Sequence, residues 1–293
     1  MNASDATVPT STEPGRDGAV GRALASRHQR VTVASMLRKG VENTGSPVQF
    51  AVRVIRELPV AGRLYPAEVF RHAGLLIRAN SAVIFFMMFM LGAVFSLASH
   101  FLFSSIGIES YVAAAHTIGG MRGITEVVFG WTVAAKIGCG IVAEIGSMRI
   151  SDEIDAMEVM GIRSIPYLVG TRILAALIVT PFLWASSLSL NFLSADLFNV
   201  KLLATTSQGA FAYFLYLFQN GQDFLISVIW ATVLMLMIII VASFYGYTAR
   251  GGPVGVGRNT AQSMLVNLVL ISMTALMLVQ LFYGNAPNAP IGN

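Results

Sequence analysis

Long uninterrupted apolar runs dominate the pattern of hydrophobic and polar positions along this 293-residue chain. Most of these runs contain no Asp, Glu, Lys or Arg, and their polar flanks are short. A transmembrane helix needs about 20 mostly apolar residues. Because lipid offers the backbone no hydrogen-bond partners, runs of this length favour helices over open strands. The pattern predicts an all-α integral membrane protein with about five transmembrane helices, at about 82–103, 123–146, 167–195, 224–249 and 261–283.

The segments outside these spans differ from them in composition. Residues 1–40 are rich in Ser, Thr, Gly, Pro and Arg and lack the apolar run of a cleavable signal peptide. They are predicted to form a disordered basic cytoplasmic tail. Residues 41–81 are predicted to be a cytoplasmic or interfacial helical segment. Within it, 66–78 is amphipathic, which suits a helix in the headgroup plane or one packed on protein.

Composition and charge support this assignment. Hydrophobic residues make up 55% of the chain and charged residues 12%, against about 25% charged in soluble proteins. A single cysteine, Cys139, excludes an intramolecular disulfide. With a cytoplasmic N-terminus, only Arg122 and Lys201 of the 19 Lys and Arg fall outside, while Lys136 lies within a span. This positive-inside bias predicts a multi-pass protein of the inner (plasma) membrane with an extracytoplasmic tail at 284–293.

A charged stretch, SMRISDEIDAMEVMGIRSIP at 147–166, separates the second and third spans. Ser151 suits a helix N-cap, and the acids that follow it favour the positive end of the helix dipole. Gly161 and Pro166 supply a stop. The pattern predicts a short cytoplasmic amphipathic helix at about 151–161. The basic residues on either side and the lack of a nearby histidine disfavour a metal site, and a solvated charged face is the alternative.

The sequence AEIGSMRISDEIDAMEVMGI at 143–162 closely resembles the signature of the MlaE/YrbE permease family, the membrane subunits of lipid-moving ABC transporters. The resemblance extends over about residues 66–283 and predicts a permease domain at 82–283. It continues in YLVGTRILAALIVTPFL at 167–183 and GYTARGGPVGVGRNTAQSM at 246–264. With the terminal FYGNAP, these stretches are most similar to the B-type YrbE permease of actinobacterial Mce import systems.

The resemblance implies that the helix at about 151–161 is a coupling helix that docks on a cytoplasmic ABC ATPase dimer. It implies as coupling residues Arg149, Asp152, Glu153, Asp155, Met157, Glu158 and Gly161. It also implies a second permease and Mce substrate-binding proteins on the outer side. Two departures, Gly123 where the family commonly has an acid and Ala135-Lys136 where it has Gly-Arg, favour an A-type YrbE partner and hence a heterodimer. No nucleic acid, cofactor or metal is implied.

Charged side chains within a span usually face a cavity or a partner. Glu126, Lys136 and Glu144 are therefore candidate substrate or intersubunit residues. Lys136 suits an anionic headgroup, snorkelling or a partner across the bundle, and Glu144 suits a cap, Arg149 or a neighbouring subunit. A row of small residues on the same span favours close helix packing, within one subunit or between two. Its members are Gly130, Ala134 and Gly138.

The chain contains no ATP-binding motif, and GGPVGVG at 251–257 is interpreted as a loop between spans. Residues 203–221 are interpreted as an aromatic helix at the outer face. The leading hypothesis is a permease subunit, not an enzyme, that moves fatty acid, sterol or phospholipid with a separate ATPase. The alternatives are a proton-coupled transporter using Glu126 or Glu144, and a scaffold subunit of a lipid-transfer complex.

Overall fold

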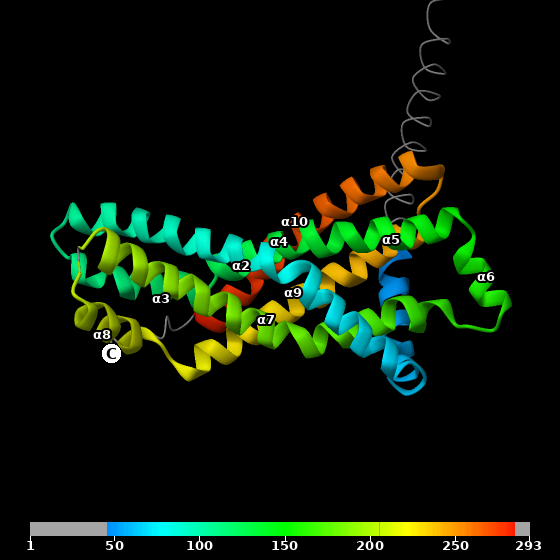
Figure 1. Cartoon of the computed structure of the whole chain (residues 1–293), viewed down its shortest axis with the longest axis horizontal. Helices are drawn as coiled ribbons and strands as arrows, with labels where there is room; N and C mark the ends of the chain where they lie inside the picture. The colour runs from blue at the N-terminus through cyan, green and yellow to red at the C-terminus, as the bar shows by residue number, and fades with distance from the viewer. Residues whose placement is uncertain (1–45, 205, 285–293) are drawn as a thin grey trace, which may run out of the picture. The chain divides into compact units, whose positions relative to one another are not determined.

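A computed structural model describes residues 46–204 and 206–284. The chain divides into two units, Met1–Phe50 and Ala51–Asn293, and the second contains the helical bundle considered below. Its described residues form helices and turns without a strand (Figure 1). This confirms the predicted all-α class. The predicted tails, 1–40 and all but the first residue of 284–293, lie outside the described residues.

Five helical segments of the described chain are long and apolar enough to cross a membrane. Two of them contain π-helical turns, which are η2, η3 and η4. The turn η2 joins the helices α4 and α5 into one span. The segments, with their constituent elements, are α2 (Pro66–Ser104), α4 (Ile124–Val133) with η2 (Ala134–Gly138) and α5 (Cys139–Ile150), η3 (Pro166–Gly170) with α7 (Thr171–Asp196) and η4 (Leu197–Leu202), α9 (Gly221–Tyr247), and α10 (Gly252–Tyr283). The prediction of about five spans is confirmed.

Short elements connect the spans at the two ends of the bundle. The helices η1 (Glu109–Tyr111), α3 (Val112–Met121) and α8 (Gln208–Phe218) lie at one end, and α6 (Glu153–Val159) lies at the other (Figure 1). The aromatic helix expected within 203–221 is α8. These connections place successive spans in opposite directions, as a membrane-crossing chain requires.

Helix α9 lies at the centre of the packing. Its side chains Leu234, Ile238 and Ile239 are fully buried. A Cβ placed on Gly130 would lie 3.2 Å from Leu234 Cδ1, and one on Gly138 would lie 3.1 Å from Ile238 Cγ2. Together with the fully buried Ala134, these glycines face α9 and α10 of the same chain. The row of small residues therefore packs within one subunit.

Two boundaries differ from the sequence interpretation. The amphipathic segment at 66–78 is continuous with the first span in α2, which begins with Pro66 in its first turn. Whether those first turns lie in the headgroup plane stays a prediction. The interpretation of GGPVGVG as a loop was wrong, because α10 begins at Gly252. Proline is compatible with a first helical turn, and Gly251 adopts a positive φ of 84° that reverses the chain just before it.

Candidate functional site: an acidic turn and two apolar cavities

The segment predicted to couple to an ATPase forms α6, which is shorter than the expected 151–161. Ser151 is not its N-cap, and that expectation was wrong. The Ser151 hydroxyl donates instead to Ser147 O at the end of α5, so the chain turns one residue later, at Asp152 with φ 58°. Only Ile154 is buried in α6, which leaves the acids of this helix facing outward.

Gly161 ends α6 through a backbone motif. Its φ is +82°, its N–H donates to Glu158 O, and the Ile162 N–H donates to Met157 O, each at 3.0 Å. This pair of hydrogen bonds is a Schellman motif, which favours glycine at the left-handed position. Gly161 therefore has a local structural reason for its position after the helix.

The acids of α6 are largely engaged within the chain. Arg149 Nη1 lies 2.5 Å from Asp155 Oδ1, and the Ser164 hydroxyl donates to Glu158 Oε1 at 2.5 Å. The Ser151 hydroxyl also donates to Glu153 Oε1 at 2.9 Å. These contacts join α6 to the end of α5 and to the segment before η3. A seven-residue helix is too short to be stable alone, so these bonds contribute to its fixed position.

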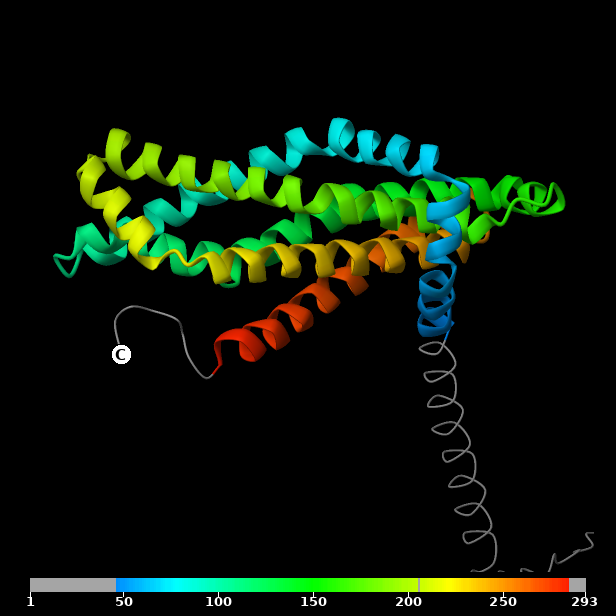
Figure 2. The same ribbon diagram turned by 90° about the horizontal axis from the view of Figure 1, so that it is seen from below.

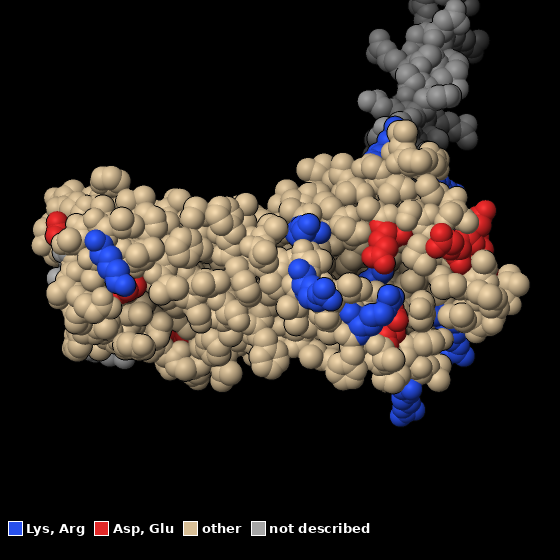
Figure 3. Space-filling model, viewed as in Figure 1, with Lys and Arg blue, Asp and Glu red and all other residues tan. Residues whose placement is uncertain are grey.

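Most charged side chains on one face of the molecule gather over the half that carries α6 (Figure 3). Glu144 belongs to this end and pairs with Arg172, at 2.6 Å between Oε1 and Nη2. The expectation that Glu144 pairs with Arg149 was wrong, because Arg149 pairs with Asp155. The Arg172 side chain is almost fully buried, and the pair joins α5 to the first turn of α7.

Lys136 lies in the π-helical turn η2 with its side chain exposed on the outside of the single chain. Among the described residues it has no ion-pair partner, so the expected partner across the bundle is not found within this chain. Ala135 and Trp131 on the same span are also exposed. A charged side chain in the middle of a span is costly against hydrocarbon. Snorkelling, an anionic headgroup or a neighbouring protein at this face would lower that cost.

At the opposite end, Glu126 is fully buried and stabilises the start of α4. Its Oε2 accepts the Gly123 N–H at 2.9 Å, and Gly123 has a φ of +152°. The acid three residues into a helix is a capping-box signal, which the sequence carried as Gly123 to Glu126. Glu126 therefore caps α4 through Oε2, while its Oε1 is buried without a hydrogen-bond partner among the described residues.

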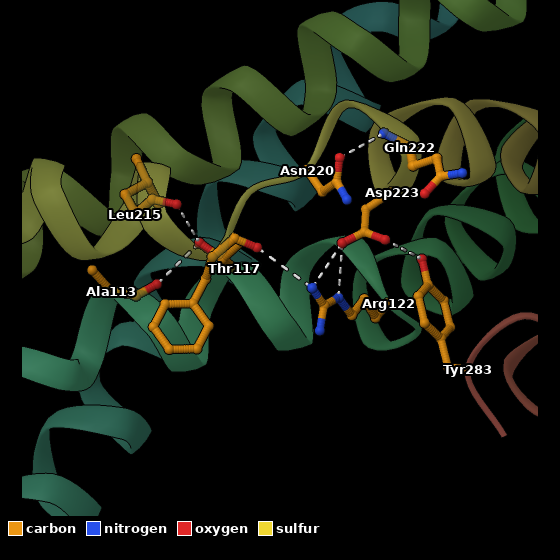
Figure 4. A network of polar contacts seen from close by, with 9 residues as sticks. Ala113, Thr117, Arg122, Leu215, Asn220, Gln222, Asp223 and Tyr283 are labelled. Carbon is orange, nitrogen blue, oxygen red and sulfur yellow. Dashed lines mark hydrogen bonds and ion pairs between the residues drawn. The ribbon is translucent and has the colours of Figure 1, made fainter. Parts of the chain in front are cut away.

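A buried polar network that no sequence pattern indicated lies beside Glu126. Arg122 Nε and Nη2 donate to Asp223 Oδ2 at 3.1 and 2.7 Å, and the Tyr283 hydroxyl donates to Asp223 Oδ1 at 3.3 Å (Figure 4). The network joins the turn between α3 and α4 to the start of α9 and the end of α10. Arg122 and Asp223 lie far apart in the sequence, and no local pattern links them.

Two apolar cavities lie next to this network. One, of about 750 Å³, is lined by α3, α4 and the outer half of α10, and includes Trp131 and Leu276 with Arg122 and Tyr283. The other, of about 550 Å³, is lined by α2, α3 and α8. Figure 2 shows α10 leaning away from α9 toward its C-terminal end. Cavities of this size and polarity suit small hydrophobic ligands.

Five apolar helices, with an acidic turn at one end and apolar cavities near the other, define a multi-pass membrane protein. Residues 69–281 match the sequence profile of the family described as Permease MlaE, and the chain belongs to this family. This confirms the family resemblance seen in the central motif.

Individual relatives agree with this assignment. A probable ABC transporter permease protein of Rickettsia bellii is 31% identical over 196 residues, 67% of this chain and 75% of the relative. One of Rickettsia prowazekii is 30% identical over 197 residues, with the same shares. The chloroplastic protein TRIGALACTOSYLDIACYLGLYCEROL 1 of Arabidopsis thaliana is 23% identical over 191 residues, 63% of this chain and 52% of the relative.

Proposed function

We propose that this chain is the permease subunit of an ABC-type lipid transporter, driven by a separate cytoplasmic ATPase that pushes on α6. The match to the MlaE permease family over 69–281 carries the proposal. The position of α6 adds support, because it projects at the end of the bundle opposite the apolar cavities. ATPase closure at one end then acts on a lipid site at the other.

The contacts of α6 suit the transmission of movement. The Arg149–Asp155 pair ties it to α5, and the Ser164–Glu158 bond ties it to the segment leading into α7. Helix α5 packs against α9 and α10. A rigid-body shift of α6 would therefore pass to the spans that line the larger cavity. No covalent chemistry is required of this chain.

A lipid substrate suits the chemistry of both cavities, whose linings are largely apolar. The Arabidopsis relative is named after a galactolipid, which is consistent with lipid transport in the family. The substrate class within this proposal is fatty acid, sterol or phospholipid.

The proposal includes a heterodimer with an A-type YrbE permease and an Mce system on the outer side. Lys136 is exposed in the second span, and a symmetric dimer across this face would bring two ammonium groups together. A different permease that offers an acid or a backbone carbonyl at this position avoids that repulsion. The outer helix α8 exposes Tyr213 and Tyr216, which suit contact with an Mce protein or with headgroups.

No specific observation favours the proton-coupled alternative. Glu126 caps α4, and Glu144 is paired with Arg172. A transporter driven by these groups would lose lipid uptake in Glu126→Gln and Glu144→Gln variants and retain it with an inactive ATPase.

A cysteine crosslink tests the coupling role. Cys139→Ser leaves no natural cysteine, and Ala156→Cys then places one reactive thiol on the exposed surface of α6. We expect a bifunctional thiol reagent to link this variant to the ATPase in membranes that contain both proteins. Tyr216→Cys on α8 serves as the matched control and is expected to give no such product. Lipid uptake that persists with an ATPase unable to hydrolyse ATP, or a tagged chain that purifies without an ATPase, would contradict the proposal.

A further inference from the structure

The most exposed apolar side chains of the α6 turn lie at its end. Val159 is 90% exposed and Met160 68% exposed. Val159 is the last residue of α6 and Met160 follows it, just before the left-handed Gly161. The Schellman motif fixes the backbone here, so the two side chains project from an ordered turn.

The acids of the same turn are less available to a partner. Asp155 is paired with Arg149, Glu158 accepts from Ser164, and Glu153 accepts from Ser151. Protein interfaces are enriched in Met and Arg and depleted in Asp and Glu. The contacts that these acids make within the chain, and the usual residue composition of interfaces, both disfavour the acids as the main binding groups.

A polar groove of about 400 Å³ lies beside this apolar tip. One wall is formed by Arg53 and Glu57 of the helix at 51–64, and the other by residues 158 and 161–165. Glu57 Oε1 lies 3.4 Å from Arg53 Nε. The Arg163 side chain lines the same groove, and within the described part of the chain it has no ion-pair partner. An unpaired guanidinium in a groove suits a carboxylate from another protein.

We infer that Val159, Met160 and Arg163 form the main binding surface for the ATPase, whereas the α6 acids hold the turn in place. The inference rests on the proposed function, because the occupant is the ATPase subunit. Val159 and Met160 enter an apolar cleft of that subunit, and one of its carboxylates reaches Arg163. Gly161 and Ile162 alone separate Met160 from Arg163, so a single partner can engage both features.

The test measures how much ATPase purifies with the tagged chain from membranes in which both proteins are produced. The Val159→Ser/Met160→Ser variant is expected to lower the ATPase yield at least about tenfold, since two apolar side chains no longer leave water on binding. Arg163→Glu is expected to lower it by a similar factor. All three positions are exposed, so the substitutions leave the packed interior unchanged.

Matched variants separate this inference from general effects of the substitutions. Val254→Ser alters a valine that is 79% exposed in the first turn of α10, and Arg250→Glu alters an exposed arginine in the preceding turn. Asp152→Asn/Glu153→Gln removes two exposed negative charges without changing side-chain size, and the amide oxygen introduced at position 153 can still accept the hydrogen bond from Ser151 that helps to hold the turn. All three control variants are expected to retain the ATPase at the wild-type level.

Wild-type yields with Val159→Ser/Met160→Ser, or loss of the ATPase in the Asp152→Asn/Glu153→Gln variant alone, would overturn the inference. In either case an intact crosslink from Ala156→Cys to the ATPase would leave the proposed function standing. Absence of that crosslink in the otherwise wild-type chain would overturn both.

Discussion

The pair formed by Arg122 and Asp223 is the most deeply buried ion pair among the described residues. The two side chains are 6% and 1% exposed, and Tyr283 adds a third contact to the carboxylate. Removing one member of a buried pair leaves an uncompensated charge, which costs more than the pair itself contributes. The stability of the α8 end of the bundle therefore depends on both members being present.

Asp223→Asn is expected to destabilise the protein by about 3–5 kcal/mol, because Arg122 keeps its charge and loses its counter-ion. Thermal unfolding in detergent micelles measures this as a large fall in Tm. Glu57→Gln is the matched control, since it breaks the exposed pair with Arg53 and is expected to cost no more than about 1 kcal/mol. Equal effects of the two variants would contradict the assignment of a buried ion pair.

His116 on α3 gives the protein a pH-dependent stability. Burial lowers the pKa of His116 to about 4, although the ring Nε2 donates a hydrogen bond to Asn191 Oδ1 at 2.9 Å. The unfolded chain has a histidine pKa near 6.5 and so binds more protons than the folded chain between these values. The contribution of His116 is complete above about pH 6.5 and is lost as the pH falls toward 4.

We expect Tm to fall between pH 7.5 and pH 5.0, and to fall less in a His116→Gln variant, which has no group to titrate at this position. The measurement is thermal unfolding of both proteins in the same detergent at the two pH values. An identical pH dependence in the two proteins would remove His116 as its source.

At the scale of elements, α2 and α7 lie along each other at unusually close range. A Cβ on Gly92 would lie 2.4 Å from Asn191 O and 3.0 Å from Ser194 Cβ. The Asn191 side chain also donates to Met88 O at 3.0 Å, which fixes the register of the two helices. Only glycine at position 92 allows the two helix backbones to approach this closely without one of them moving.

Gly92→Ala is expected to destabilise the protein by about 1–3 kcal/mol, since a backbone atom cannot move aside as a side chain can. Gly74→Ala, in the same helix, meets nothing within 4 Å and is expected to be neutral or to gain up to about 1 kcal/mol from helix propensity. The two Tm values provide the comparison. A fall in Tm for both variants would show that glycine flexibility, and not close packing, matters here.

The long elements and the short helices α6 and α8 were predictable, whereas α3 and the start of α10 were not, for physical reasons. Each span is indicated by an apolar run that is long enough, as a helix, to cross the bilayer. Helix α3 has ten residues, VAAAHTIGGM, too few and too small to produce such a signal. The start of α10 was mistaken for a loop because glycine and proline also mark a helix start. Among the site residues, the pairs Glu144–Arg172 and Arg122–Asp223 depend on tertiary packing that no local spacing encodes.

At the scale of the whole molecule, the direction of coupling depends on which side of the membrane α6 faces. The positive-inside rule predicts that the α6 end faces the cytoplasm, because Arg149, Arg163 and Arg250 belong to this end of the bundle. The α8 end carries Lys201 and the apolar cavities. An ATPase and an extracytoplasmic lipid donor would then act on opposite ends of one bundle.

Thiol labelling tests this orientation in a Cys139→Ser background. In sealed membrane vesicles with the outer face exposed, a membrane-impermeant maleimide is expected to label Tyr216→Cys on α8 at once. It is expected to label Ala156→Cys on α6 only after the vesicles are opened, because the reagent cannot cross the bilayer. Mass spectrometry of the tagged chain measures both. Labelling of Ala156→Cys in closed vesicles would put α6 on the outer side, where no cytoplasmic ATPase can reach it, and the reversed pattern would overturn the predicted topology.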